Sequence, residues 1–184
     1  MRTASCLVAL LVLAACRIER AASGRPPGTR TAVDSLNLVE RDSATREEVR
    51  LALHGYYDRF SRRDWRAYAA MFWDQATITT RWTRPGERAE RVVVQTIDEF
   101  VRAAPAGPGR LAVFSEQPVS MDIHGYGDLA QAWVVYRARF GTTSDSVAVH
   151  HGVDAFHLMK HDGAWRITGL TFINESPDRP LVPR

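Results

Sequence analysis

The sequence predicts an α+β fold, in which helices near the N-terminus precede a series of antiparallel strands. Three observations predict it. Apolar residues recur at helical spacing between residues 45 and 60, residues 111–174 read as successive strand-length runs, and turns rich in glycine and aspartate separate those runs. At 184 residues, the chain is long enough for one domain of ordinary size and too short for two large ones.

The first helix is expected to begin at a capping box. Thr45–Glu48 matches this motif, in which a threonine hydroxyl and a glutamate carboxylate each accept a backbone N–H at the start of a helix. Apolar side chains then recur at helical spacing at Val49, Leu53, Tyr56 and Phe60. We therefore expect an amphipathic helix of about four turns from residue 45.

Two shorter helices are expected, each opened by a capping residue. Asp64 is suited to cap a second helix that runs from Trp65 to Phe72. Thr96 and Glu99 form a second capping box, which opens a third helix that ends before Pro105.

Two strands are expected between the second and third helices, and four more after the third. A bulge is expected near Pro118, because proline cannot donate to a strand ladder. The expected ranges are 76–82, 91–94, 111–124, 130–140, 146–160 and 164–174.

The charge distribution argues against a nucleic-acid partner. The chain has a net charge of +3 and a pI of about 9.2. Between residues 43 and 176, however, sixteen basic residues balance sixteen acidic ones, so the domain itself is neutral. A nucleic-acid surface needs a concentrated basic stripe, and this sequence supplies none.

The first sixteen residues predict a lipid-modified export signal. Arg2 precedes an apolar run at 7–15, which is the length of a signal-peptide core and about half of what spans a bilayer. The run ends in Leu13–Cys16, which resembles the bacterial lipobox, so we expect a diacylglyceryl thioether on Cys16. Because residue 17 is Arg17 and not aspartate, the expected location is the outer membrane of a bacterial cell envelope, facing the periplasm. The alternative is a plain secretory signal with a chance cysteine.

Four segments follow: a signal peptide at 1–15, a lipidated flexible tether at 16–43, a folded domain at 44–176 and a tail at 177–184. The tether is expected because residues 17–42 lack a sustained apolar period and contain Gly24, Pro26, Pro27 and Gly28. Cys6 lies in the segment that cleavage would remove, so the mature chain is expected to form no internal disulfide.

The domain resembles the nuclear transport factor two-like, or SnoaL-like, superfamily over about residues 44–175. The matching residues are Arg63-Asp64-Trp65, the segment Met71–Ile78, and the late segments Asp154–Leu158 and Gly163–Ile167. The resemblance implies a cone, built from a curved antiparallel sheet packed on three N-terminal helices. It also implies a mouth that leads to an apolar cavity, and a homodimer formed through the outer sheet face.

Two residues match ketosteroid isomerase, a member of this superfamily. Tyr56 lies eight residues before Asp64, where the isomerase has its oxyanion tyrosine, and Asp154 matches its oxyanion carboxylic acid. Both could donate a hydrogen bond to a developing enolate, and burial would keep Asp154 protonated. The position of the isomerase base falls on Thr80, which cannot abstract a proton at neutral pH, so the resemblance leaves enzyme activity open.

Each candidate also has an ordinary structural interpretation. Tyr56 fits a core aromatic residue on an apolar helix face, and Asp154 fits a buried ion-pair partner for Arg137 or Arg139 on the neighbouring strand. Alternation places His150 on the same strand face as Asp154, where it could replace the missing base. An exposed histidine at the sheet edge explains His150 more simply.

No metal or other cofactor is expected. The histidines of the late strands divide between both faces and a turn, and no cysteine accompanies them. The sequence also lacks a glycine-rich phosphate loop, a serine nucleophile motif and a CxxC pair.

An aromatic-lined pocket for a flat apolar ligand is expected to include Trp73, Ile78, Thr80, Trp82 and Phe156. The leading hypothesis is therefore a lipid-anchored domain that binds a small, mainly apolar molecule. Two alternatives stay open. One is an isomerase, cyclase or dehydratase that acts next to a carbonyl, and the other is a non-catalytic interaction module whose own side chains fill the cavity.

Overall fold

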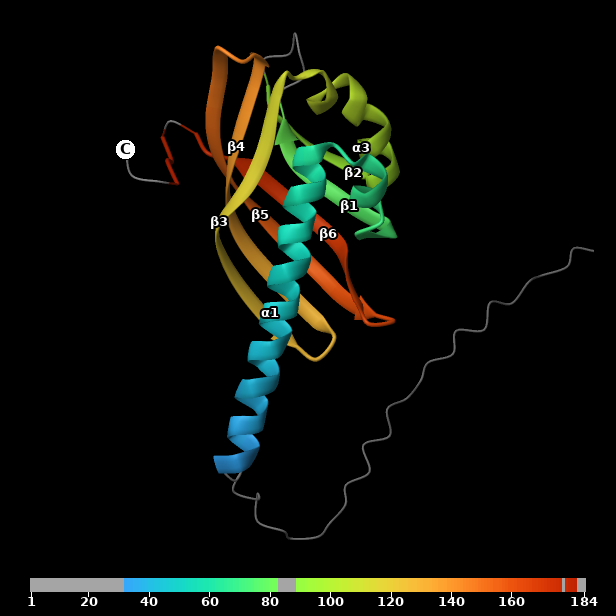
Figure 1. Ribbon diagram of the computed structural model, residues 1–184, viewed down its shortest axis with the longest axis vertical. Helices are drawn as coiled ribbons and strands as arrows, with labels where there is room; N and C mark the ends of the chain where they lie inside the picture. Colours follow the sequence, from blue (N-terminus) through green and yellow to red (C-terminus); the bar gives the residue numbers. More distant parts are fainter. Residues whose placement is uncertain (1–31, 83–88, 177, 182–184) are drawn as a thin grey trace, which may run out of the picture. The chain divides into compact units, whose positions relative to one another are not determined.

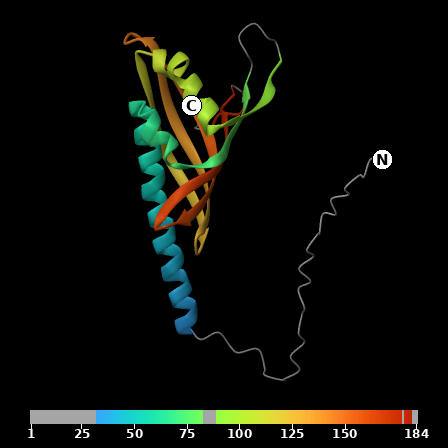
Figure 2. The same cartoon turned by 90° about the vertical axis from the view of Figure 1, so that its right-hand side faces the viewer.

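One six-stranded sheet, with helices against one of its faces, makes up the folded domain (Figure 1, Figure 2). The computed structural model describes residues 32–82, 89–176 and 178–181, with side chains from residue 43 onward. We call the helix-covered face of the sheet the inner face. The elements in chain order are α1 (Ala32–Arg62), α2 (Trp65–Ala69), β1 (Phe72–Trp82), β2 (Arg91–Thr96), α3 (Ile97–Ala103), the 3-10 turns Ala104–Ala106 and Pro108–Arg110, β3 (Val113–Tyr126), β4 (Leu129–Thr143), β5 (Ser146–His161) and β6 (Ala164–Asn174). The predicted α+β class is confirmed.

The strand order is β2-β1-β6-β5-β4-β3, and one pair departs from the antiparallel sheet that we expected. Strands β1 and β6 run parallel, with Ile78 opposite Leu170, whereas the other described pairs are antiparallel. The reason is topological. A hairpin fixes the relative direction only of strands that are neighbours in the chain, such as β1 and β2 or β3 to β6. Strand β1 pairs with β6, which is distant in the chain and runs in the same direction.

Helix α1 begins at Ala32, well before the start that we predicted at residue 45. Residues 32–43 are therefore helical, and the prediction of a flexible tether over 16–43 was wrong for this part. The last helix-breaking residue of the linker is Gly28, and no glycine or proline follows until Gly55, so nothing in this stretch stops a helix. Glu48 consequently does not cap the helix; its carboxylate instead accepts hydrogen bonds from Lys160 Nζ at 2.6 Å and Trp165 Nε1 at 2.9 Å.

The two other predicted caps are confirmed. Asp64 accepts a hydrogen bond from the backbone N–H of Ala67, and Thr96 and Glu99 form a complete capping box at the start of α3. Helix α2 is shorter than predicted, because Phe72 already belongs to β1, where it lies opposite Ile167 of β6. The sheet ladder thus overrides the apolar helical spacing of Trp65, Tyr68 and Phe72.

A bulge in β3 determines which side chains of that strand face inward. The register shifts between Pro118 and Ser120, as predicted from the proline. A bulge adds one residue to one strand, so the alternation of faces changes parity there. As a result Phe114 and Glu116 are buried on the same side as Ile123.

Gly152 of β5 makes room for a side chain that crosses it. Tyr136 of β4 lies opposite Gly152, and its hydroxyl donates a 2.7 Å hydrogen bond to Oδ1 of Asn174 on β6. A Cβ atom on Gly152 would overlap the ring and hydroxyl of Tyr136. The missing side chain therefore allows one tyrosine to link three strands.

We predict that Gly152→Ala lowers the free energy of unfolding by about 1–3 kcal/mol, because the new methyl group displaces the Tyr136 ring. Urea denaturation measures this. The matched control is Gly169→Ala on β6, where a Cβ atom would meet only His157 Nδ1 at 3.9 Å, an ordinary contact. Equal stability of the two variants would show that the Tyr136 crossing is not constrained by Gly152.

Candidate functional site

A cavity of about 270 Å³ lies between the helices and the inner face of the sheet. Of the fifteen described residues that line it, eight are aromatic, among them Phe60, Phe100, Phe114, Phe140 and Phe172. Its polar lining comes from side chains of α1, α2, β3, β4, β5 and β6 that converge on one apolar space. Such convergence is typical of a ligand site in a protein of this size.

Asp154 projects from β5 into this interior. Its side chain is 2% exposed and lines the cavity, and the Tyr57 hydroxyl donates a 2.6 Å hydrogen bond to its Oδ2 atom. Burial raises the pKa of Asp154 to about 7, although the hydrogen bond from Tyr57 favours the ionised form. The expected ion pair with Arg137 or Arg139 is absent among the described residues, because both arginines are exposed and alternate to the outer face of β4.

Glu116 of β3 is a second buried carboxyl that lines the same cavity. It is 8% exposed, and Ser61 of α1 fixes its backbone through hydrogen bonds to both its N–H and its C=O at 2.8 Å. Burial raises the pKa of Glu116 well above its usual range, and the neighbouring charge of Asp154 raises it further. Two acidic groups with raised pKa values therefore face one apolar space, an arrangement that is concentrated at functional sites.

Sequence reasoning missed Glu116 and Tyr57. Glu116 was hidden by the β3 bulge, since simple alternation back from Ile123 places it on the wrong face. Tyr57 had a usable signal, because it lies eight residues after Val49 and belongs to the same helical stripe as Leu53.

Tyr56 packs among aromatic rings, and it also lines the cavity. Its ring meets Phe156 edge-on at 5.0 Å between centroids, and its hydroxyl accepts a 3.2 Å hydrogen bond from Tyr68 of α2. Burial raises the pKa of Tyr56 well above 10, so its hydroxyl keeps its proton and is available as a donor.

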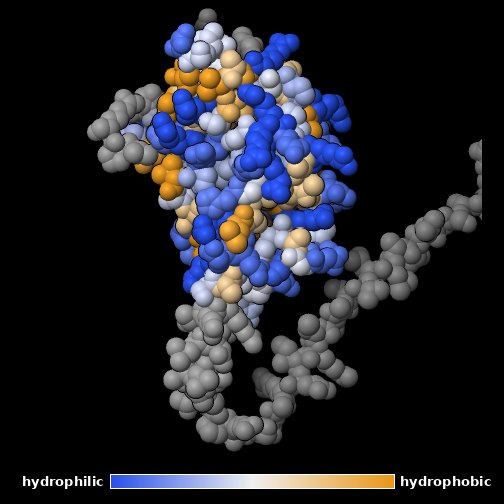
Figure 3. Space-filling view, in the orientation of Figure 1, coloured by the Kyte–Doolittle hydropathy of each residue, from blue (hydrophilic) through white to orange (hydrophobic). Residues whose placement is uncertain are grey.

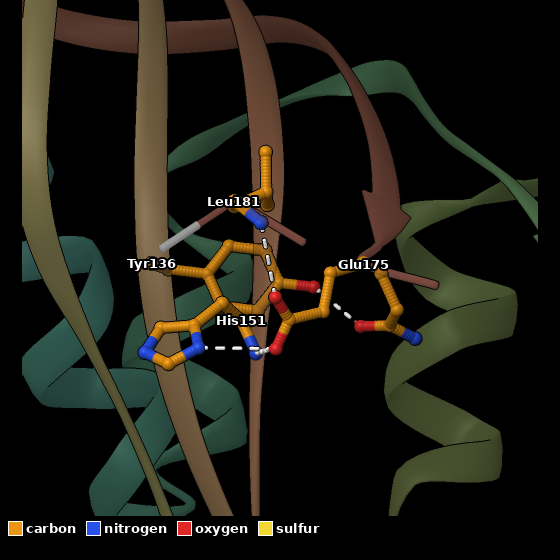
Figure 4. A network of polar contacts seen from close by, with 5 residues as sticks. Tyr136, His151, Glu175 and Leu181 are labelled. Carbon is orange, nitrogen blue, oxygen red and sulfur yellow. Dashed lines mark hydrogen bonds and ion pairs between the residues drawn. The ribbon is translucent and has the colours of Figure 1, made fainter. Parts of the chain in front are cut away.

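A network of polar contacts lies at the Asn174 end of the cavity (Figure 4). Beside the Tyr136–Asn174 hydrogen bond, the Glu175 carboxylate accepts hydrogen bonds from the backbone N–H groups of His151 and Leu181, and it contacts the His151 ring at 3.1 Å. These contacts hold the segment after β6 against β5 and keep Asn174 in place at the cavity wall.

The other candidates are only partly brought together. Ile78 lines the cavity. Phe156 packs edge-on against the Tyr56 ring and is not among the described lining residues. Thr80 instead lines a shallow depression with residues of the outer face, and Trp82 is 49% exposed. They do not form part of the cavity wall because the sheet curves away from the helices toward the end of β1 (Figure 2).

Trp73 and His150 also lie away from the cavity lining. The Trp73 ring packs near His161 and Arg166, and its buried Nε1–H has no hydrogen-bond partner among the described residues. His150 is exposed, with its ring 6.3 Å from that of Phe140. Cys16 lies outside the described residues.

Searches with the sequence found no match among family models or curated proteins. Solved structures gave matches over most of the domain. A protein of unknown function from Mycobacterium tuberculosis matches at a TM-score of 0.61 with 16% identity, over 85% of this chain and 83% of that one. An NTF2-like protein of unknown function from Pseudomonas putida matches at 0.56 with 14% identity, over 71% and 86%. The domain has the NTF2-like fold.

A third match of the NTF2-like domain is to a protein from Novosphingobium aromaticivorans that bears the name "Putative Scytalone Dehydratase". The TM-score is 0.60 with 14% identity, over 82% of this chain and 98% of that one. At these identities the likeness establishes the fold alone, and the side chains of the cavity must carry any argument about function.

The described part of the chain contains neither a cluster of metal ligands nor a membrane-spanning helix. No three histidine, cysteine, aspartate or glutamate side chains in the described part of the chain gather as a metal site would require. Within those same ranges, no helix combines the length and the apolar character needed to cross a bilayer.

We predict that Asp154→Asn removes a pH dependence of stability. The unfolded aspartate ionises above its ordinary pKa of about 3.9, whereas the folded one keeps its proton up to about pH 7. The stability that this difference supplies is fully present below about pH 4 and is lost by about pH 7, at up to about 1.4 kcal/mol for each pH unit.

The stability of Asp154→Asn relative to the wild type should therefore rise between about pH 4 and pH 7, as urea denaturation at several pH values would measure. Asp122→Asn, which removes an exposed carboxylate of the same sheet, is the matched control and should show no such trend. A difference between Asp154→Asn and wild type that stays constant with pH would contradict the burial of an acid at this position.

Proposed function

We propose that the domain binds a small, mainly apolar molecule in the cavity, where Asp154, Glu116 and Tyr56 orient its polar group. The observation that carries this proposal is the convergence of those three side chains on one aromatic-walled space of about 270 Å³. An apolar cavity of about 150 Å³ is enough to hold one benzene ring. A ligand with one ring and a short substituent therefore fits the available volume.

Two observations support a ligand over a purely structural role. The interaction-module hypothesis required the domain's own side chains to fill the cavity, but about 270 Å³ of it is unfilled. In addition, two buried carboxyl groups are costly to maintain in an apolar core, and such groups are usually retained where a ligand or reaction uses them.

A second candidate function is a proton-transfer enzyme, and Glu116 is the observation that favours it. The isomerase-type reaction lacked a base in the sequence because Thr80 occupies the usual position, but Glu116 presents a titratable carboxyl to the same cavity. One ionised carboxyl of the pair would remove a proton from carbon next to a carbonyl, while the other, still protonated, and Tyr56 would donate hydrogen bonds to the developing oxyanion. Return of the proton to another carbon completes an isomerisation.

Native mass spectrometry of the full-length chain, released from detergent, tests the binding proposal. We expect a species with extra mass that is lost on denaturation. Ile78→Phe, which extends a ring into the cavity, should reduce its abundance several-fold, whereas Ile173→Phe on the exposed outer face should not. A clean apo mass under gentle conditions, with no uptake of added small aromatic compounds, would contradict the proposal.

A ring-opening assay with 5-nitrobenzisoxazole distinguishes a binding protein from an enzyme. This flat ring system opens when a base removes one carbon-bound proton. A proton-transfer site should accelerate ring opening, and Glu116→Gln should reduce the rate by about 100-fold or more. Binding without acceleration would leave the binder proposal in place and remove the enzyme.

We further propose that Cys16 is lipid-modified and anchors the chain in the bacterial cell envelope, on the periplasmic side of the outer membrane. The support is the sequence pattern Leu13–Cys16 behind an apolar run. Membranes from a bacterial host that expresses the full chain should retain the wild-type protein after a carbonate wash and lose Cys16→Ser. Retention of the Cys16→Ser variant would contradict lipid anchoring.

We also propose self-association through the outer sheet face. Exposed Trp133, Ile173 and Val92 border one shallow apolar depression there, together with buried Val153. On the opposite, helix-covered face, hydrophilic residues predominate and apolar ones form small separate groups (Figure 3). We expect the native mass spectrum to show a dimer, and a monomer alone would contradict the proposal.

A further inference from the structure

We infer that the cavity selects an apolar molecule that carries a positively charged amine, because two acidic side chains, Asp154 and Glu116, face an aromatic-walled space whose described lining contains no basic side chain. This inference rests on the proposed function and names the chemical class of its ligand. It is carried by the placement of the two carboxyls on different strands around one cavity.

The two carboxyls lack a cationic partner among the described residues. None of the fifteen residues described as lining the cavity is lysine, arginine or histidine. Arg63 contacts two lining residues: its Nη2 donates to the carbonyl oxygen of Leu111, and its guanidinium lies 5.3 Å from the centroid of the Phe114 ring. Tyr57 gives Asp154 one neutral donor, and no described side chain donates to the carboxyl of Glu116.

The aromatic walls suit the same ligand. The face of an aromatic ring carries negative potential and attracts ammonium groups, and this attraction grows when water is excluded. An ammonium group between carboxylates and such rings gains charge-assisted hydrogen bonds together with contacts to the rings. Burial raises the pKa of both carboxyls, so a nearby positive charge would favour their ionised form.

Other ligand classes fit less well. A carboxylate or phosphate would be repelled by the two acids and would find no basic side chain among the described lining residues. A neutral carbonyl compound would accept hydrogen bonds from Tyr56 and, of the two acids, only from the protonated form, so its affinity would rise as the pH falls. An amine needs ionised acids, so its affinity rises with pH, and the direction of the pH dependence distinguishes the two.

Other ionisable groups surround this pair and are accounted for. Glu116 also borders a shallow groove between α1 and β3, in which His54 and Asp58 take part. Beyond the lining, Arg63 lies over Phe114, His150 lies beside Phe140, and the His151–Glu175 pair lies next to Asn174. The tyrosines around the two carboxyls do not titrate in the experiment, because burial raises the pKa of each of them above the working range: Tyr56, Tyr57, Tyr68 and Tyr136.

The test compares 2-phenylethylamine with 2-phenylethanol, which have the same shape and differ in charge. Isothermal titration calorimetry of the full-length chain measures both at pH 6 and pH 8, where the amine is protonated throughout. We expect the amine to bind at least 10-fold more tightly than the alcohol at pH 8. We expect this preference to fall several-fold at pH 6, because protons then compete for Asp154 and Glu116.

Two variants assign the effect to the cavity. Glu116→Gln and Asp154→Asn keep the shape and remove one charge each, so each should reduce amine affinity at pH 8 and leave alcohol affinity nearly unchanged. Asp122→Asn, an exposed carboxylate on β3, should change neither. Should either cavity variant fail to fold, the rise of amine affinity relative to alcohol affinity between pH 6 and pH 8 in the wild type still decides the matter.

The outcomes separate this inference from the proposed function. Equal binding of amine and alcohol, or an amine affinity that does not rise with pH, overturns the inference and leaves apolar ligand binding in place. Absence of binding by both compounds overturns the proposed function and the inference with it.

Discussion

The burial of Asp154 in an apolar interior is the constraint on which the rest of the domain depends. A carboxyl group transferred from water into such surroundings is costly unless it is hydrogen-bonded or keeps its proton. Here the Tyr57 hydroxyl supplies the hydrogen bond at 2.6 Å, and burial raises the pKa of Asp154 to about 7, so the group keeps its proton at lower pH. Because Tyr57 lies on α1 and Asp154 on β5, this single contact also fixes the helix against the middle of the sheet.

Two local features of strands β3 to β5 shape the cavity: the missing side chain of Gly152 and the bulge in β3. Gly152 lets Tyr136 lie across β5 and reach Asn174, which turns a bulky ring along the wall and not into the space. The β3 bulge then brings Glu116 to the inner face. The cavity therefore depends on the missing side chain of Gly152 and on the extra residue of the β3 bulge. No basic side chain among the described lining residues neutralises its two carboxyls.

The sequence predicted the local structure well where a short-range rule applies. Asp64, Thr96 and Glu99 cap helices as expected, and Pro118 marks the bulge. It failed where tertiary pairing decides, as in the recruitment of Phe72 into β1 and the parallel contact between β1 and β6. Asp154 could be singled out because a carboxyl stands among apolar residues on a central strand. Glu116 required the bulge at Pro118 to be counted into the alternation of β3, because simple alternation back from Ile123 places it on the outer face.

The most direct test of this account is to titrate the two cavity carboxyls themselves. Carbon-13 NMR of the side-chain carboxyl carbons of Glu116 and Asp154 follows each group through its own ionisation, and Glu116→Gln and Asp154→Asn assign the signals. We predict that both groups titrate well above the ordinary range of exposed acids, and that Asp154→Asn lowers the pKa of Glu116, because the charge of Asp154 contributes to its raised value. Titration of both near pH 4, independent of one another, would contradict the burial of both carboxyls in one shared cavity.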